Sequence, residues 1–333
     1  MKKKLHDKAF RTCVRFTIFP ARLVLSWEPV CGKMEAAMAE FHIGTAGWSY
    51  KDWEGIVYPA HKSAEFHALV FLADYINLVE VNSTFYRPPV MRVALSWVKK
   101  VQHRPDFLFA VKLHQNFTHG ERRFTQKETD EFKFGIEPLR AHSRLCAILI
   151  QFPWSFKDSG INREHLERIF QAFHDYPLAL EVRHGSWNRP DFFLWLQSNQ
   201  VGFCNIDQPV INDSLSPTSV QTHPEFTYVR LHGRNYKNWF SRSAGRDARY
   251  NYLYGGEELD DWVGRIKGLG EKSRNVFVVT NNHYQGQALA NALQIKNKLT
   301  GEKVDIPLDL IKRYPLLREI VKKIGKGQLD LFE

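Results

Sequence analysis

Eight short runs of strand-forming residues, separated by helix-like segments, constrain the fold of this chain more than any other feature. The separating segments, such as 163–176 and 257–269, repeat apolar residues every three or four positions, which is typical of amphipathic helices. Alternating strands and helices form parallel sheets. Eight such units in about 250 residues predict a (β/α)8 TIM barrel. The predicted strands lie in 41–47, 77–85, 107–114, 144–153, 177–184, 201–207, 226–233 and 275–282.

The chain divides into one barrel domain with a flanking piece at each end. We expect residues 41–300 to form the barrel, 301–326 to form a C-terminal helix and a tether, and 327–333 to be a short linear motif. Residues 1–40 precede the first strand. We interpret them as a disordered extension or a start-site artefact, because two methionines stand just before that strand.

Composition and charge indicate a cytoplasmic protein with an anionic partner. Apolar runs reach only strand length, well short of the roughly 18 residues that a membrane span needs. Four cysteines without paired spacing indicate reduced thiols rather than a disulfide framework or a zinc site. The net charge is +10; the first 40 residues hold eight Lys or Arg and four Asp or Glu, so the remainder keeps +6. A sustained positive charge favours binding to polyanions.

Polar side chains recur late in the predicted strands. Side chains alternate between the two faces of a strand, and in a barrel one face points inward. Active sites of this architecture lie at the carboxyl ends of the strands. The inward sets predicted in this way are Glu80 and Asn82, Lys112 and His114, Glu181 and Arg183, Asn205 and Asp207, Arg230 and His232, and Thr280 and Asn282, with Gln151 near the end of the fourth strand.

The inward charges have two interpretations. A buried charge costs several kcal/mol unless it is paired, so a barrel that needed only stability would place aliphatic residues there. The charges therefore predict either an active site or a self-satisfied ion network. For an active site, the catalytic candidates are Glu80, Lys112, Glu181, Asp207 and His232. The substrate-binding candidates are Trp48, Tyr50, Asn82, Tyr86, Gln151, Arg183, His184, Trp187, Arg230, Asn281 and Asn282.

The segments after the strands mix aromatic residues with Lys and Arg, as in 47–59 and 232–256. Aromatic faces stack on bases or sugars and cations neutralise phosphates, so this mixture favours single-stranded or extruded nucleic acid. The alternative is that aromatic residues such as Trp48 and Trp53 plug the core over the barrel mouth.

Seven motifs occur in order along the chain: "IGTAGWSYKDWEGIVYP", "VEVNSTFYRPP", "FAVKLHQNFTH", "LIQFPWSF", "LEVRHGSW", "YVRLHGR" and "TNNHYQGQALANAL". Together they resemble the YecE-like family of bacterial and archaeal TIM-barrel proteins, a domain of unknown function. The resemblance runs from about Phe41 to Leu293. It implies the barrel fold. Because that family has no assigned reaction, the resemblance says almost nothing about chemistry.

Two versions of the chemistry follow from the candidates. In one, inward carboxylates and histidines bind a divalent metal, although the sequence has no HxH or HExxH spacing. In the other, Lys112, Arg183 and Arg230 hold a phosphate or carboxylate while Glu80 or Glu181 moves a proton. We favour the metal-free version, because cations interleave with the carboxylates. No P-loop, Rossmann or nucleophile-elbow motif occurs.

The chain ends in an apolar peptide that follows a glycine-rich tether. Gln328, Leu329, Leu331 and Phe332 resemble the sliding-clamp-binding motif of bacterial DNA polymerases and repair proteins. The resemblance implies that the Gln fills a small pocket while the Leu and Phe fill a hydrophobic one, as a disordered peptide does when it docks by a few anchors. The alternative is a structural hook that covers the bottom of the barrel.

Three functional hypotheses remain. The leading one is a barrel enzyme, a hydrolase or lyase, that acts on nucleic acid or another phosphate-containing substrate and reaches DNA repair sites through a sliding clamp. The second is a non-catalytic nucleic-acid or clamp adaptor whose inward charges are structural. The third is a small-molecule hydrolase or isomerase without a role at DNA. None of the three involves a membrane.

Overall fold

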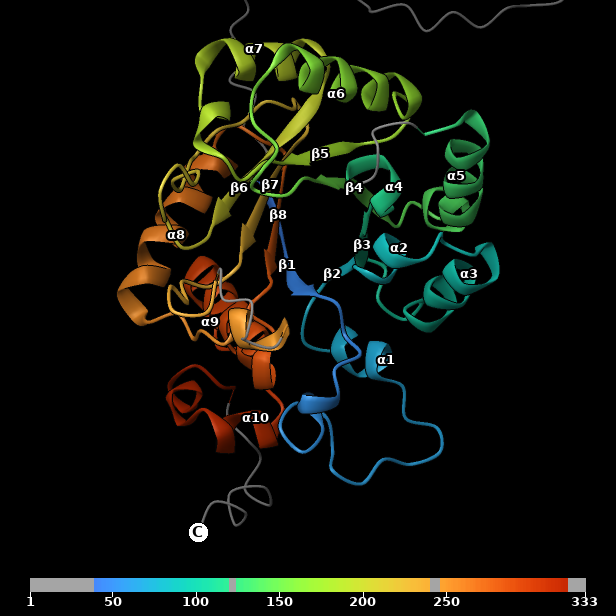
Figure 1. The fold of residues 1–333 in the computed structure, drawn as a ribbon. Helices are drawn as coiled ribbons and strands as arrows, with labels where there is room; N and C mark the ends of the chain where they lie inside the picture. Colours follow the sequence, from blue (N-terminus) through green and yellow to red (C-terminus); the bar gives the residue numbers. More distant parts are fainter. Residues whose placement is uncertain (1–38, 120–123, 240–245, 323–333) are drawn as a thin grey trace, which may run out of the picture. The chain divides into compact units, whose positions relative to one another are not determined.

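Eight parallel strands form one closed barrel in the computed structural model, which describes residues 39–119, 124–239 and 246–322. Each strand pairs with the next along the chain, and the last pairs with the first (Figure 1). This confirms the (β/α)8 fold expected from the sequence. The strands are β1 (Glu40–Ala46), β2 (Leu78–Val81), β3 (Leu108–Lys112), β4 (Leu145–Gln151), β5 (Leu178–Glu181), β6 (Val201–Asp207), β7 (Phe226–Leu231) and β8 (Asn275–Thr280).

Helices surround the strands (Figure 1). The α-helices are α1 (Ala68–Ala73), α2 (Ser83–Tyr86), α3 (Met91–Lys100), α4 (Gln115–Thr118), α5 (Gln126–Ala141), α6 (Gly160–Ala172), α7 (Pro190–Ser198), α8 (Gly256–Gly270), α9 (Gln287–Thr300) and α10 (Leu308–Arg313). The short 3-10 helices are η1 (Lys51–Trp53), η2 (Gly185–Trp187), η3 (Arg246–Tyr250), η4 (Tyr284–Gly286) and η5 (Pro315–Glu319). Capping residues determine where two of these helices begin: Thr125 and Glu128 form a capping box at α5, and Ser159 caps α6.

The connection between β6 and β7 departs from the regular repeat, because residues 208–225 contain no helix. Asn205 of β6 fixes this segment. Its Oδ1 accepts hydrogen bonds from Thr218 Oγ1 and from the Val220 backbone N–H, each at 2.8 Å. A buried amide thus replaces the apolar contacts that a helix would make on this side of the barrel.

After α9 the chain forms two short helices rather than one long one. Pro315 is the first residue of η5, and α10 ends before it because proline lacks a backbone N–H and disfavours helical geometry at the residue before it. Residues 1–38 and 323–333 lie outside the described residues. The expected N-terminal extension, most of the expected tether and the C-terminal motif are therefore not described.

Strand register shows which side chains of β6 point into the barrel. Ile206 pairs with Arg230 of β7, and paired residues of neighbouring strands share a face. Cys204 and Ile206 therefore point inward, whereas Asn205 and Asp207 point outward. The inward placement expected for Asn205 and Asp207 is wrong. Their polar side chains are satisfied by segments outside the barrel, which the alternation within one strand does not reveal.

The same reasoning corrects β8. Val279 pairs with Arg230, so Thr280 and Asn282 point outward, contrary to expectation, while Asn281 points inward. Asn282 Nδ2 donates a hydrogen bond to Asn291 Oδ1 of α9 at 2.8 Å. Thr280 Oγ1 also contacts a backbone carbonyl of that helix. These two polar residues dock α9 onto the strand.

Apolar and aromatic side chains fill the space between the strands and the helices. Trp53, Trp187 and Trp262 are all fully buried. Among the described residues, no helix is long and apolar enough to cross a membrane.

Candidate active site

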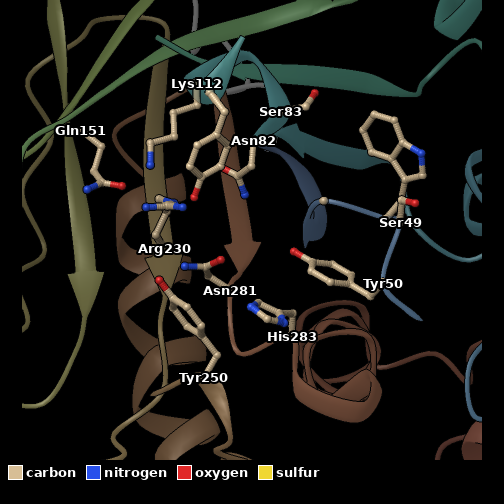
Figure 2. A pocket seen from close by; sticks show the side chains of 13 residues that line it. Ser49, Tyr50, Asn82, Ser83, Lys112, Gln151, Arg230, Tyr250, Asn281 and His283 are labelled. Carbon is tan, nitrogen blue, oxygen red and sulfur yellow. The ribbon is translucent and has the colours of Figure 1, made fainter. Parts of the chain in front are cut away.

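A pocket of about 400 Å³ opens at the carboxyl ends of the strands (Figure 2). Its lining comes from the ends of three strands, β3, β4 and β7, and from the segments that follow β1, β2, β7 and β8. This is the place where the fold puts active sites. The lining residues are Gly47, Trp48, Ser49, Tyr50, Asn82, Ser83, Tyr86, Lys112, Gln151, Arg230, Tyr250, Asn281 and His283.

Most of this lining was predicted from the sequence, and four polar or aromatic members were not. The predicted members are Trp48, Tyr50, Asn82, Tyr86, Lys112, Gln151, Arg230 and Asn281. Sequence reasoning missed Ser49, Ser83, Tyr250 and His283. Ser49, Ser83 and His283 follow strand ends closely, so their positions carried a signal. Tyr250 lies in a long segment whose path the sequence did not indicate.

Aromatic rings form one wall of the pocket. Gly47 adopts a positive φ of 85° directly after β1, which turns the chain toward Tyr50. The rings of Tyr50 and His283 stack with centroids 4.4 Å apart and planes 8° apart. Tyr250 lies against the same imidazole at 4.8 Å. A planar substrate ring can pack on such a wall.

Below the pocket, Arg230 joins two carboxylates that lie on strands far apart in sequence. Its Nη2 donates to Glu80 Oε1 at 2.6 Å, and its Nη1 donates to Glu181 Oε2. Tyr228 donates to the other Glu80 oxygen at 3.0 Å, and Arg183 Nε donates to Glu181 Oε1 at 2.9 Å. Both carboxylates are fully buried and do not line the pocket. This network resembles the structural alternative more than a pair of free acid–base groups.

Electrostatics fix the charge state of this network. Burial acts to raise the pKa of the Glu181 carboxyl, but Arg230, His232 and Arg183 together hold that pKa well below its usual range. Burial acts to lower the pKa of Arg230, and the two carboxylates raise it well above its ordinary value. Arg230 is therefore a permanent cation at the pocket floor. Within the described structure, its Nε has no hydrogen-bond partner although the residue is only 1% exposed.

Lys112, at the end of β3, is the second basic group in the pocket. Its Nζ lies 3.9 Å from the centroid of the Phe85 ring. Among the residues that the structure describes, no carboxylate lies within ion-pair distance of this amine. Burial lowers the pKa of Lys112 to about 7, and the charge of Arg230 contributes in the same direction. A large part of the amine is therefore neutral near neutral pH.

His232 is buried beside the network and is neutral. Burial lowers its pKa to about 3, although the Glu181 charge acts to raise it. His232 Nε2 lies 3.3 Å from Glu181 Oε1, and Nδ1 lies 2.9 Å from Asn281 Nδ2. A carboxylate only accepts, so the ring proton belongs on Nε2, and Nδ1 accepts from Asn281. His232 thereby orients an amide that lines the pocket.

Other sequence-predicted residues lie away from this pocket. Asp207 accepts from Arg234 Nη2 at 2.7 Å and from the indole of Trp262. Trp187 is fully buried and donates to a backbone carbonyl. His184 is also buried, and its Nδ1 accepts from the Ser186 backbone N–H at 3.1 Å. None of these side chains contributes to the pocket lining. They hold loops and helices in place.

Metal-ligating residues are dispersed in the described part of the chain. No group of three or more His, Cys, Asp or Glu side chains there is arranged to hold a metal ion. The carboxylates closest to the site, Glu80 and Glu181, are engaged by Arg230. Burial also raises the pKa of the Cys204 thiol well above its usual value, so this thiol stays protonated.

Comparison with known proteins shows where this barrel belongs. Residues 42–313 match the family described as "Protein of unknown function DUF72". The chain belongs to the DUF72 family. This match supports the YecE-like resemblance at a general level, as membership of an uncharacterised barrel family.

Relatives of the DUF72 family and of UPF0759 resemble this chain along most of their length. The UPF0759 protein YunF of Bacillus subtilis (strain 168) is 32% identical over 274 residues, which cover 78% of this chain and 95% of that protein. A DUF72 family protein of Thermotoga maritima is 34% identical with a TM-score of 0.70, covering 78% of this chain and 99% of that structure. One from Enterococcus faecalis is 26% identical with a TM-score of 0.71, covering 80% and 97%.

Proposed function

We propose that this DUF72 protein is an enzyme that binds a small phosphate-containing substrate in the barrel mouth and uses Lys112 to move a proton. One observation carries the proposal: the Lys112 amine shares a pocket with the Arg230 guanidinium, and no described carboxylate pairs with the amine. An amine without a carboxylate partner, beside a guanidinium, favours an anionic ligand. Within the described residues Arg230 Nε has no hydrogen-bond partner, so it keeps one N–H for a ligand that reaches it.

The two basic groups have different roles. Arg230 is held by Glu80 and Glu181 and stays charged, so it orients an oxyanion and does not exchange protons. Lys112, with a pKa of about 7, exists in both protonation states near neutral pH, as a general acid or base requires. The proton-transfer role that the sequence suggested for the carboxylates therefore passes to Lys112.

The substrate is either a free small molecule or one nucleotide unit of a nucleic acid. A pocket of about 400 Å³ falls within the usual size range of small-molecule sites. The stacked Tyr50 and His283 rings suit a base or another planar ring. A long single-stranded segment would instead need an extended groove.

A pair of charge-matched variants tests the proposal. We expect inorganic phosphate or a nucleoside monophosphate to bind the wild-type protein and to bind Lys112→Met at least about tenfold more weakly, since one charge-assisted contact is lost. Lys127→Met removes the same charge from a side chain that is 83% exposed and should bind like the wild type. Titration calorimetry measures all three. Equal binding by both variants would contradict the proposal and favour a non-catalytic adaptor.

A sequence observation favours a second role, recruitment to a bacterial sliding clamp during DNA repair. The support is the terminal Gln328, Leu329, Leu331 and Phe332 after a glycine-containing tether, all of which lie outside the described residues. We expect a labelled peptide covering 322–333 to bind the clamp of the source organism with micromolar affinity in fluorescence anisotropy. Gln328→Ala and Phe332→Ala peptides should lose binding. No binding by the parent peptide would refute this role.

A further inference from the structure

Lys112 is held so that its amine lines the pocket without forming an ion pair. The Lys112 backbone carbonyl accepts a hydrogen bond from Thr84 Oγ1 at 2.6 Å, which fixes the end of β3 against α2. The side chain then passes over the face of Phe85. Phe85 is itself held edge-on by the ring of His119 at 4.9 Å. One side of the amine is therefore covered by an aromatic ring, while the other side lines the pocket.

The surrounding charges leave the nitrogen lone pair available. The carboxylates closest to this site are saturated by Arg230, Arg183 and Tyr228, so neither forms an ion pair with Lys112 in the described structure. The fixed charge of Arg230 disfavours a second cation beside it. A lysine that is desolvated and lies next to another cation is an activated nucleophile. A lysine that serves only to bind an anion gains nothing from this arrangement.

The other lining groups suit a carbonyl compound. Figure 2 shows the Lys112 amine, the Arg230 guanidinium and the Gln151 amide directed into one part of the pocket. Amide N–H groups can donate to a carbonyl oxygen, and Arg230 can hold a phosphate or carboxylate on the same molecule. The aromatic wall of Tyr50 and His283 gives a planar portion a surface to pack against.

We propose that Lys112 forms an imine with the carbonyl group of a small substrate that also carries a phosphate or carboxylate. This inference rests on the proposed function and names its substrate class. The Lys112 nitrogen adds its lone pair to the carbonyl carbon, and the carbonyl oxygen takes up a proton. The nitrogen then loses a proton, the hydroxyl group gains one and leaves as water, and a C=N bond forms. Nothing is oxidised or reduced, and no further reactant is needed.

Pyridoxal 5′-phosphate is a suitable probe, because it combines an aldehyde, a phosphate and a planar ring. We expect borohydride to trap this probe on Lys112 at least about tenfold faster than on any other lysine, because burial beside Arg230 gives this amine a larger neutral fraction than an ordinary lysine has at pH 7. The rate at Lys112 should rise with pH with a midpoint near 7. Peptide mass spectrometry identifies the modified residue.

Two variants provide the controls. Lys112→Arg keeps the positive charge and cannot form the imine, so the fast labelling should disappear while the protein remains folded by circular dichroism. Lys127→Arg changes an exposed lysine of α5 and should label at the wild-type rate. Labelling that is spread evenly over surface lysines, with Lys112 no faster than the rest, would overturn the imine.

Two further experiments distinguish the imine proposal from the proposed function: labelling with pyridoxal, which has no phosphate, and competition by inorganic phosphate. Selective labelling of Lys112 that phosphate suppresses supports both. Selective labelling by pyridoxal and pyridoxal 5′-phosphate alike, without protection by phosphate, supports the imine and contradicts an anionic substrate. Lys112-dependent phosphate binding without selective labelling leaves the proposed function standing and overturns the imine.

Discussion

Lys112 and Arg230 share one pocket, but their pKa values shift in opposite directions. Arg230 has two carboxylate partners, which offset the cost of burying its charge and raise its pKa well above the ordinary value. Lys112 has an aromatic ring as its neighbour, and burial lowers its pKa to about 7. The Phe85 ring acts against this shift, because a cation over an aromatic face gains about 0.5–2 kcal/mol. Burial and the nearby guanidinium still dominate.

This contrast predicts a pH-dependent stability effect of Lys112→Met. The pKa of Lys112 falls from 10.5 to about 7 on folding, so the unfolded chain binds more protons between these values and wild-type stability rises across this window. Below pH 7 the full cost of the buried charge is present, and the variant should be more stable by about 0.5–2 kcal/mol. The difference should vanish or change sign by pH 9, because the wild-type protein gains about 1.4 kcal/mol per pH unit above the lowered pKa. Urea denaturation at pH 6 and pH 9 measures it; a difference independent of pH would contradict the lowered pKa.

A second residue-scale prediction concerns Glu181. Glu181→Gln removes a partner from both Arg230 and Arg183 in a buried network, and we expect a loss of about 3–5 kcal/mol. The folded-state pKa of Glu181 lies well below its usual range, so this contribution is complete at neutral pH and is lost only in acid.

The matched control for Glu181 is an exposed ion pair. Glu54 contacts Lys62 at 2.7 Å and is 51% exposed. We expect Glu54→Gln to cost far less stability than Glu181→Gln, because solvent screens such pairs. Denaturant unfolding at pH 7 compares the two variants. Similar losses in both would mean that the network does not hold the pocket floor.

The sequence predicted single residues of the site well where one strand alone decides their place. Lys112, Gln151 and Arg230 come late in strands, and the barrel rule is enough to bring them together. The sequence did not show that Glu80 and Glu181 are ion-paired while the Lys112 amine is not, because pairing depends on distances across the barrel.

At the scale of elements, the outward face of β6 contacts helix α8 and the segment after β7. Asp207 accepts from Arg234, in the segment after β7, and from Trp262 of α8. Arg234 also donates to Glu258 of α8 at 2.9 Å. These contacts fix α8 against the strands. Asp207 is therefore positioned to stabilise the fold, on the opposite face of β6 from the pocket.

This assignment predicts the effect of Asp207→Asn. The variant weakens two charge-assisted contacts, so we expect a loss of about 1–3 kcal/mol in the free energy of unfolding. The rate of pyridoxal 5′-phosphate labelling at Lys112 should stay unchanged. A large fall in that rate for the folded variant would return Asp207 to the catalytic candidates.

Elements also show why sequence reasoning assigned some faces wrongly. Polar residues alternate in β6 and β8 as they do in β7, so each pattern predicted a polar interior. Register across the barrel decides which face is inward, and Ile206 and Val279 are the partners of Arg230. On the outward face of β6, Asn205 holds the helix-free segment 208–225 and Asp207 contacts Arg234 and Trp262, and no local signal indicated these partners.

For the whole molecule, the fold follows from the repeated pattern of strands and helices. That pattern extends over most of the chain, and residues 42–313 match the DUF72 family. The net charge of +10 favours anionic partners, and the pocket concentrates two of the cationic groups. Activity does not follow from the fold, because barrels of one architecture host many reactions. We propose that it depends on the protonation state of Lys112.

Direct titration of Lys112 tests this account most simply. Protein labelled with ¹³C at the lysine Cε gives one NMR signal for each lysine, and Lys112→Arg identifies the signal of Lys112. We predict a midpoint near pH 7 for this signal, with a shift to higher pH when inorganic phosphate is added, because a bound anion favours the ammonium form. A midpoint near 10.5, unaffected by phosphate, would contradict the assignment of Lys112 as the reactive group of this pocket.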